Sequence, residues 1–236
     1  MPNHATLDPD THCDLRVSFA RGAHLGDAVM SAIAVPSEFR RVQNDYAILF
    51  RLDLATDRFD AHAMFGFEPG ENLYLDGDRW DAGALPLAID IQPFLIGRTR
   101  EGDLRQVHID LDHPRIDAAG VRLFDEDGRS TPFLEAAIEK LRALDAGYQA
   151  APDFFAALRR HDLLEPFTLE VTLADGAVHR LVGYHVIDEE KLRALDAAAL
   201  GELHAAGHLM PAFMALASLT NLSGLVARKN RRDGNG

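Results

Sequence analysis

One stretch constrains the fold more than any other: Glu165 to Leu195, which predicts a β-hairpin followed by a helix. Polar residues alternate with apolar ones in its first half, the period of a strand with one buried face; the apolar residues are Phe167, Leu169, Val171 and Leu173. Asp175-Gly176 follows, a pair that suits the positive φ angles of a two-residue type I′ turn. The pattern therefore predicts two antiparallel strands.

The turn also predicts the register of this hairpin. With Asp175 and Gly176 as the loop, the apolar sides of both strands coincide, and the predicted pairs are Leu173 with Val178, Leu169 with Val182, and Phe167 with Tyr184. Asp188 then offers a helix N-cap, and Glu189 and Glu190 lie in the first turn, where the helix dipole favours negative charge. A helix should begin directly after the second strand.

The remaining chain predicts strands first and helices later. Residues 46–54 and 59–67 form a second apolar hairpin pattern, and shorter strands are expected at 72–75, 94–96, 107–111 and 121–124, with a brief helix at 85–91. Pro132 suits a first helical position, and Gly147 is expected to end that helix before a shorter one around 154–158. The predicted fold class is α+β, a mainly antiparallel sheet covered by C-terminal helices.

The C-terminal part predicts two further helices. Asp196 is expected to cap the first, which Gly207 ends, and Pro211 is expected to open the second. The last helix is apolar along one side, through Phe213, Leu216, Leu219, Leu222 and Val226. This composition fits either burial in the core or a dimer contact, and we expect burial.

Composition excludes several classes of function. The chain has 236 residues and a formal net charge of -13, so phosphate backbones and anionic lipid would repel it. Cys13 is its one cysteine, which rules out an internal disulfide. The first residues lack the pattern of a secretion signal, and no run of about 18 consecutive apolar residues occurs. We expect a cytoplasmic protein that neither binds nucleic acid nor inserts into a membrane.

Several stretches together resemble the SapC family of bacterial proteins: DYAILF, GENLYLDGDRWD, LPLAIDIQPFLIG, LFDEDGRSTPFLEAAIEKL, TLADGAVHRLVGYHVIDEEKLRAL and LASLTNL. The similarity spans about Phe39 to Arg228. It implies one SapC-like domain over residues 36–228. Weak patterning predicts an irregular N-terminal segment at 1–35, and the basic residues near the C-terminus predict a flexible tail at 229–236. Members are often encoded near TonB-dependent receptors, which implies a supporting role in surface or uptake systems, with no known reaction.

The leading hypothesis is a non-catalytic accessory or binding protein of SapC type, linked to bacterial surface or outer-membrane uptake systems. It would act on a protein or a small-molecule ligand, with no metal or cofactor. Tyr74, Arg79 and Trp80 are the candidate lining of a ligand pocket, and the alternative for Trp80 is a place at the edge of the folded core.

A competing hypothesis is a non-haem iron, 2-oxoglutarate-type oxygenase. His108 and Asp110 are two residues apart on a predicted strand, so their side chains share a face, and His179 or His185 would complete a facial triad. Helices are predicted where such an enzyme fold needs strands, which argues against it. A third hypothesis is a homodimeric structural or interaction protein whose interface is the last helix.

Overall fold

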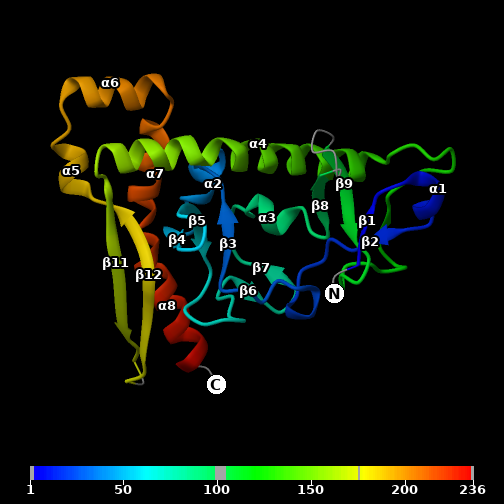
Figure 1. Ribbon diagram of the computed structural model, residues 1–236. Coiled ribbons are helices and arrows are strands. Elements are labelled where there is room, and N and C mark those ends of the chain that lie inside the picture. Colours follow the sequence, from blue (N-terminus) through cyan, green and yellow to red (C-terminus); the bar gives the residue numbers. More distant parts are fainter. Residues whose placement is uncertain (1–2, 99–104, 175, 235–236) are drawn as a thin grey trace. The chain divides into compact units, whose positions relative to one another are not determined.

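The computed structural model describes residues 3–98, 105–174 and 176–234, which fall into two compact units (Figure 1). The first unit comprises residues 1–27, 75–80 and 87–146, and the second comprises 28–74, 81–86 and 147–236. Antiparallel sheets and C-terminal helices confirm the predicted α+β class. The range 36–228, expected as one domain, contributes to both units.

The first unit contains three small antiparallel sheets. Their strands are β1 (His4–Thr6), β9 (Arg105–Asp110) and β8 (Phe94–Arg98) in that spatial order, β10 (Val121–Arg122) with β2 (Arg16–Val17), and β6 (Leu75–Asp76) with β7 (Arg79–Trp80). The helices are α1 (Pro9–His12), a 3-10 turn at Ala23–Leu25, α3 (Leu87–Asp90) and the first part of α4 (Pro132–Arg160). Ile109, Leu123 and Leu134 are almost completely buried at the centre of the core.

The N-terminal segment differs from the irregular structure expected for residues 1–35. β1 pairs with β9, placing Thr6 opposite His108, and β2 pairs with β10. A third strand, β3 (Ser31–Ala34), belongs to the sheet of the second unit. Short strands of two to four residues carry too little alternation to be recognised from sequence, since their pairing comes from distant segments.

The second unit is built on a five-stranded antiparallel sheet in the order β11-β12-β4-β5-β3. Its further strands are β4 (Ile48–Asp53), β5 (Arg58–Met64), β11 (Leu164–Thr172) and β12 (Val178–Ile187). β4 and β5 form the predicted second hairpin, with Asp53 opposite Arg58. A 3-10 turn at Pro36–Glu38 leads into α2 (Phe39–Val42), and α5 (Glu189–Arg193), α6 (Ala197–Ala205), α7 (Leu209–Ser218) and α8 (Asn221–Gly234) follow the sheet in sequence.

The β11–β12 hairpin is confirmed, and its register is only half as predicted. Phe167 lies opposite Tyr184, as expected, but Thr172 rather than Leu173 lies opposite Val178. The loop of the hairpin is also longer than the predicted two residues, because its closing hydrogen bond runs from the Leu173 N–H to the Ala177 carbonyl at 2.8 Å. The predicted turn residue Asp175 is outside the described residues.

A β-bulge explains the shift in register. Pairing changes between Phe167 and Leu169, and the extra residue on β12 coincides with Gly183 at φ +80°, a conformation that glycine adopts without steric cost. The bulge reverses the faces beyond it. Leu181 is therefore buried and Val182 is exposed, whereas the predicted pairing had placed Val182 on the apolar side.

α4 is one continuous helix, so the prediction that Gly147 ends it was wrong. Gly147 packs closely against the side chains of Val35 and Ser37: a Cβ there would lie 2.5 Å from Val35 Cγ2 and 2.8 Å from Ser37 Oγ. Pro152 also lies inside α4, on its exposed side, where water can satisfy the carbonyl that loses its partner. Glycine serves here for close approach and not for termination.

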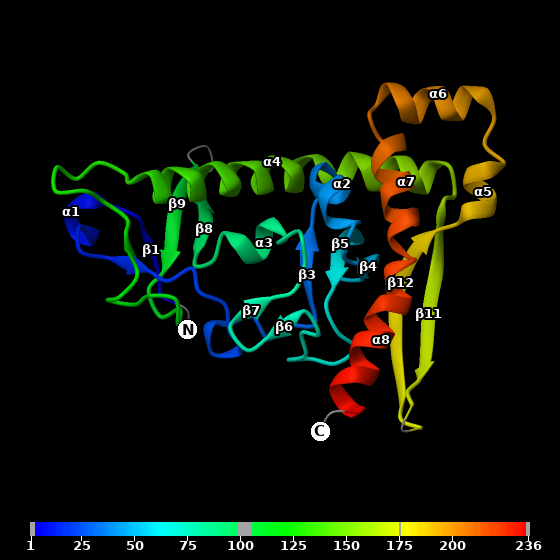
Figure 2. The same ribbon diagram turned by 180° about the vertical axis from the view of Figure 1, so that it is seen from behind.

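Both predicted N-caps of the later helices are confirmed. Asp188 accepts a hydrogen bond from the Lys191 N–H at 3.0 Å, and Asp196 accepts one from the Ala199 N–H at 2.8 Å. Gly207, at φ +74°, follows the end of α6, as expected. α7 then packs against α2, β4 and β12 within the second unit, beside the hairpin in both views (Figures 1 and 2).

The last predicted helix is divided into α7 and α8. Its expected apolar side is only partly buried, with Phe213 exposed and Leu216, Leu219, Leu222 and Val226 half-buried. The buried residues of α7 are Ala212, Ala215 and Ser218, while Phe213 is 48% exposed and Met210 is 56% exposed. By length and composition alone, the helical stretch Leu209–Gly234 would be long and apolar enough to cross a membrane, and 22% of its most apolar window is buried. α8 also includes residues 229–234 of the expected flexible tail, and Lys229 there is buried.

Candidate functional site

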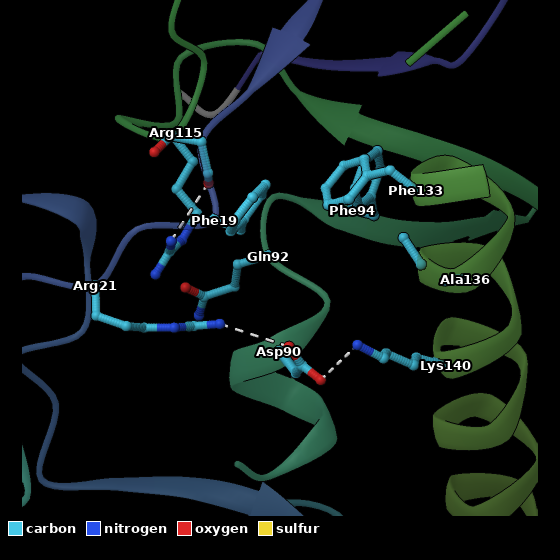
Figure 3. Close-up of a pocket in the computed structure, with 11 residues that line it drawn as sticks. Phe19, Arg21, Asp90, Gln92, Phe94, Arg115, Phe133, Ala136 and Lys140 are labelled. Atoms are coloured by element: carbon cyan, nitrogen blue, oxygen red, sulfur yellow. Dashed lines mark hydrogen bonds and ion pairs between the residues drawn. The ribbon is translucent and has the colours of Figure 1, made fainter. Parts of the chain in front are cut away.

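The first unit contains a pocket of about 300 Å³ whose lining comes from four separate stretches (Figure 3). The loop after β2 supplies Ser18, Phe19 and Arg21; the segment from α3 to β8 supplies Asp90, Gln92 and Phe94; the turn after β9 supplies Arg115; and α4 supplies Phe133, Ala136, Ala137 and Lys140. The α4 residues are spaced three and four apart, so they share one face of the helix. This face closes one side of the pocket.

One end of the pocket is aromatic. The rings of Phe94 and Phe133 lie together beside α4 (Figure 3), with centroids 6.5 Å apart. Phe19 lies 5.8 Å from Phe133 and is 60% exposed, so it forms an outer wall in contact with solvent. An exposed phenylalanine beside a cavity costs solvation free energy that a bound apolar group would recover.

A buried ion pair holds the loop beside the other end. Arg115 and Asp27 are almost fully buried, and Arg115 Nη2 donates to Asp27 Oδ1 at 2.7 Å. Arg115 Nη1 donates to the Ala20 carbonyl at 2.5 Å, and the Gly22 N–H donates to Asp27 Oδ2 at 2.9 Å. The Arg115 guanidinium thus contacts both ends of the loop that comprises residues 20–27. Such a desolvated pair is costly to break on one side only.

Arg21 is the least satisfied cation of the pocket. Its two carboxylate contacts, to Asp27 and Asp90, are both 3.5 Å long, whereas charge-assisted hydrogen bonds normally measure about 2.7–2.9 Å. Lys140 contacts the other oxygen of Asp90 at 2.8 Å. Burial and the neighbouring Arg115 lower the pKa of Arg21 from its usual value. An added anion would therefore stabilise this guanidinium.

Two buried polar atoms of the lining have no hydrogen-bond partner among the described residues: Gln92 Oε1 and Arg115 Nε. Gln92 projects between the aromatic end and the charged end (Figure 3). Buried polar atoms are nearly always paired in folded proteins, and an unpaired one indicates a missing water, ion or ligand. The lining is thus polar in the middle, charged at one end and aromatic at the other.

The structure places His108 and Asp110 on β9 in the first unit, as predicted, on one face of the strand. The His108 ring lies over Gly97 of β8, where a Cβ would be only 2.1 Å from Nε2, and its Nε2 is 3.4 Å from Thr6 Oγ1. Asp110 accepts a hydrogen bond from the Asp112 N–H at 3.2 Å. Packing and local turns account for both side chains.

The two histidines proposed as third ligand belong to the second unit. His179 Nδ1 lies 3.1 Å from Glu68 Oε1, and His185 stacks edge to face on Phe59. Burial and the nearby Arg159 lower the pKa of His185. In the part of the chain that the structure describes, no group of three or more His, Cys, Asp or Glu residues is arranged to hold a metal ion. The iron hypothesis remains a prediction. Its test is the iron content of the purified wild type compared with that of the His108→Ala variant.

Of the predicted pocket residues, Tyr74 belongs to the second unit, and Arg79 and Trp80 belong to the first. The Tyr74 hydroxyl donates to the Asp45 carbonyl at 2.7 Å, and Arg228 lies 4.3 Å above the Tyr74 ring. Burial raises the pKa of Tyr74 to about 12. Arg79 and Trp80 form β7 of the first unit, with Trp80 opposite Leu75. The three remain a predicted lining.

Sequence reasoning did not identify Arg21, Asp90, Gln92, Arg115 or Lys140. These residues are scattered over more than a hundred positions and belong to no short motif. The one available signal was the helical spacing of Phe133, Ala136, Ala137 and Lys140, which places a lysine on an otherwise apolar face. Sequence alone offered no reason to join that face to the loop after β2.

Comparison with known proteins gives one match. The SapC family model matches residues 7–225. This range includes most of the N-terminal segment that the resemblance had left out. No curated protein and no solved structure matches the chain.

Proposed function

Because the chain belongs to the SapC family, we propose that it is a non-catalytic accessory protein that binds a small molecule in the pocket of its first unit. The observation that carries this proposal is a cavity with an underbonded cation and buried polar atoms that have no partner among the described residues. A ligand would supply what these groups lack. Function lies in such a site and not in the fold class.

The lining favours binding over catalysis. Of the residues described around the cavity, one carries a hydroxyl group, Ser18, whose Oγ accepts a hydrogen bond from the Ala20 N–H at 3.3 Å. The described lining residues include no histidine or cysteine that would act as a base or nucleophile. Its ionisable groups are cations and a paired carboxylate, which suit recognition of charge.

Native mass spectrometry of the full chain, purified from a bacterial host without harsh washing, tests this proposal. The wild type should carry a small molecule that denaturation releases. Ala136→Trp should lack it, because the exposed Ala136 lines the pocket and an indole there fills the cavity without entering the core. Ala150→Trp, exposed further along α4, should keep the ligand. Equal loads in wild type and Ala136→Trp would contradict the proposal.

Family membership supports the wider part of the proposal, an accessory role beside surface or outer-membrane uptake systems, and we expect this role in the cytoplasm. Fractionation of cells that express the chain should find it in the cytoplasmic fraction. Deleting its gene should reduce uptake through a neighbouring outer-membrane receptor, and Ala136→Trp should fail to restore that uptake. If Ala136→Trp fully restores uptake, the cellular role does not depend on the pocket.

Self-association through α7 is a second candidate, favoured by the exposure of Met210 and Phe213. A second copy is the occupant that this alternative requires, since a two-fold axis would bring the same apolar face of each copy together. Phe213→Glu should then halve the mass measured by light scattering, while Leu54→Glu, at an 87% exposed site in the β4–β5 turn, should not change it. A monomeric wild type would exclude this interface.

A further inference from the structure

The charge of the pocket selects the charge of its ligand. Three cations belong to the lining, Arg21, Arg115 and Lys140, and the carboxylates beside them are Asp90 and the buried Asp27. The cations thus exceed the carboxylates by one. In a partly desolvated cavity, uncompensated charge is unfavourable, so a ligand with a single negative charge balances the site, whereas a dianion would leave an excess.

Arg21 is the cation with room for that charge. Arg115 is engaged by the Ala20 carbonyl and by Asp27, and Lys140 holds Asp90 at 2.8 Å. Among the described residues, the ion-pair contacts of Arg21 are the two at 3.5 Å, and its side chain keeps 15% of its surface exposed. A planar guanidinium presents paired N–H donors that match the two oxygens of a carboxylate.

The opposite end selects an aromatic group. Phe94 and Phe133 are tilted by 54° and Phe19 by 36° to Phe133, so the three rings form an angled apolar surface. Aromatic pairs favour tilted and edge-to-face contacts at such distances, and a flat ring fits among them. The cavity of about 300 Å³ is at the small end of ligand pockets, which limits the occupant to one ring and a short arm.

We infer that the pocket binds a small aromatic monocarboxylate, with its carboxylate on Arg21 and its ring among Phe19, Phe94 and Phe133. This inference rests on the proposed function and names the chemistry of its ligand. Gln92 lies between the two ends, where its unpartnered carbonyl oxygen can accept a hydrogen bond from a hydroxyl or amino substituent next to the carboxylate.

Calorimetric titration of the full chain with four probes tests the inference. Sodium phenylacetate should bind at one site per chain. Three further probes should each bind at least tenfold more weakly. Phenylacetamide keeps the ring and removes the charge, and acetate keeps the charge and removes the ring. Phenyl phosphate keeps the ring and carries a second negative charge. Equal or tighter binding of any of these three probes would overturn the inference.

Variants assign the contact to Arg21. Arg21→Met should weaken phenylacetate at least tenfold and leave phenylacetamide unchanged, and Arg21→Lys should recover part of the loss. Arg129→Met, at an exposed pair with Asp127 in the same unit, is the matched control and should bind phenylacetate as the wild type does. Because a melting curve for each variant reports folding, unchanged phenylacetate affinity in a folded Arg21→Met protein would overturn the assignment.

The outcomes separate this inference from the proposed function. The wild type could release a ligand that Ala136→Trp excludes. If that ligand is neutral, dianionic or without a ring, the inference of an aromatic monocarboxylate is overturned, and the pocket remains a binding site. Failure of every probe, with no ligand released from the wild type, would overturn both.

Discussion

The two units differ in what surrounds their buried polar groups. In the second unit, Tyr46 donates to the Ala84 carbonyl at 2.5 Å, and Ser218 Oγ accepts from the Ile48 N–H at 2.9 Å. The buried Lys229 of this unit is paired with Glu71 at 2.8 Å. In the first unit, Arg115 and Asp27 are buried as ions beside an open cavity. Polar groups that are paired within the protein suit a scaffold, whereas buried charge that lines a cavity suits a ligand-binding site.

The comparison predicts the largest stability loss in the aromatic core. Phe154 is 1% exposed and meets Phe39 and Phe155 edge to face. Phe154→Ala should lower the free energy of unfolding by about 3–5 kcal/mol, because it removes apolar burial and leaves a cavity. Denaturant unfolding followed by circular dichroism measures the loss. Phe213→Ala, at a half-exposed site, should cost far less, and a loss below 1 kcal/mol for Phe154→Ala would contradict the assignment of this core.

Removing one partner of the buried ion pair should also be costly. Arg115→Met leaves Asp27 as an uncompensated buried charge, so it should lower the free energy of unfolding by about 3–5 kcal/mol. The double variant Arg115→Met with Asp27→Leu should recover much of that loss.

Arg122→Met is the control for this pair, because Arg122 contacts Asp14 near the surface. A surface ion pair contributes about 0–1 kcal/mol. If Arg115→Met and Arg122→Met cost the same in denaturant unfolding, the buried pair does not hold the pocket loop.

A pH effect should mark the second unit. Burial and the nearby Arg51 lower the pKa of His62 from 6.5 to about 4, so the unfolded chain binds this proton more readily than the folded one. Stability is therefore fully present above about pH 6.5 and is lost as pH falls towards 4. The loss should be on the order of 3 kcal/mol between pH 7 and pH 4.

Denaturant unfolding across this range, with wild type and His62→Gln compared, measures the contribution of His62. The variant should show a shallower dependence on pH. Parallel curves for the two proteins would assign the acid sensitivity to other groups.

A smaller effect should separate two helical glycines. Gly147→Ala should lower the free energy of unfolding by about 1–3 kcal/mol, because the new methyl group meets Val35 and Ser37. Gly201→Ala in α6 faces open space and should stabilise the protein by up to about 1 kcal/mol through helix propensity. The two melting temperatures should move in opposite directions, and a stabilising Gly147→Ala would contradict the close packing of this glycine on Val35 and Ser37.

The sequence predicted local structure well where one segment contains the whole signal. Alternation predicted both hairpins, and side-chain capping by Asp188 and Asp196 predicted two helix starts. Contacts from distant segments decided the errors. Gly147 is fixed by packing on Val35, and the bulge at Gly183 changed the pairing that the turn alone predicted. Rules based on neighbouring residues in sequence cannot predict this packing or this bulge.

The candidate site was beyond sequence reasoning for a related reason. Its cation Arg21 and its carboxylate Asp90 are separated by β3, two hairpins and a helix, and no short motif joins them. Arg115 has no distinguishing neighbours in sequence, and its importance lies in its burial. Charges acquire a role here only after folding removes them from water.

A two-dimensional NMR titration of the full chain with sodium phenylacetate tests the central claim most directly. Shifts confined to the pocket lining, including the side-chain amide of Gln92 and the backbone of Phe133 and Lys140, are the predicted result. Shifts concentrated on α7 and α8, with the pocket lining unchanged, would contradict it and place binding on the second unit.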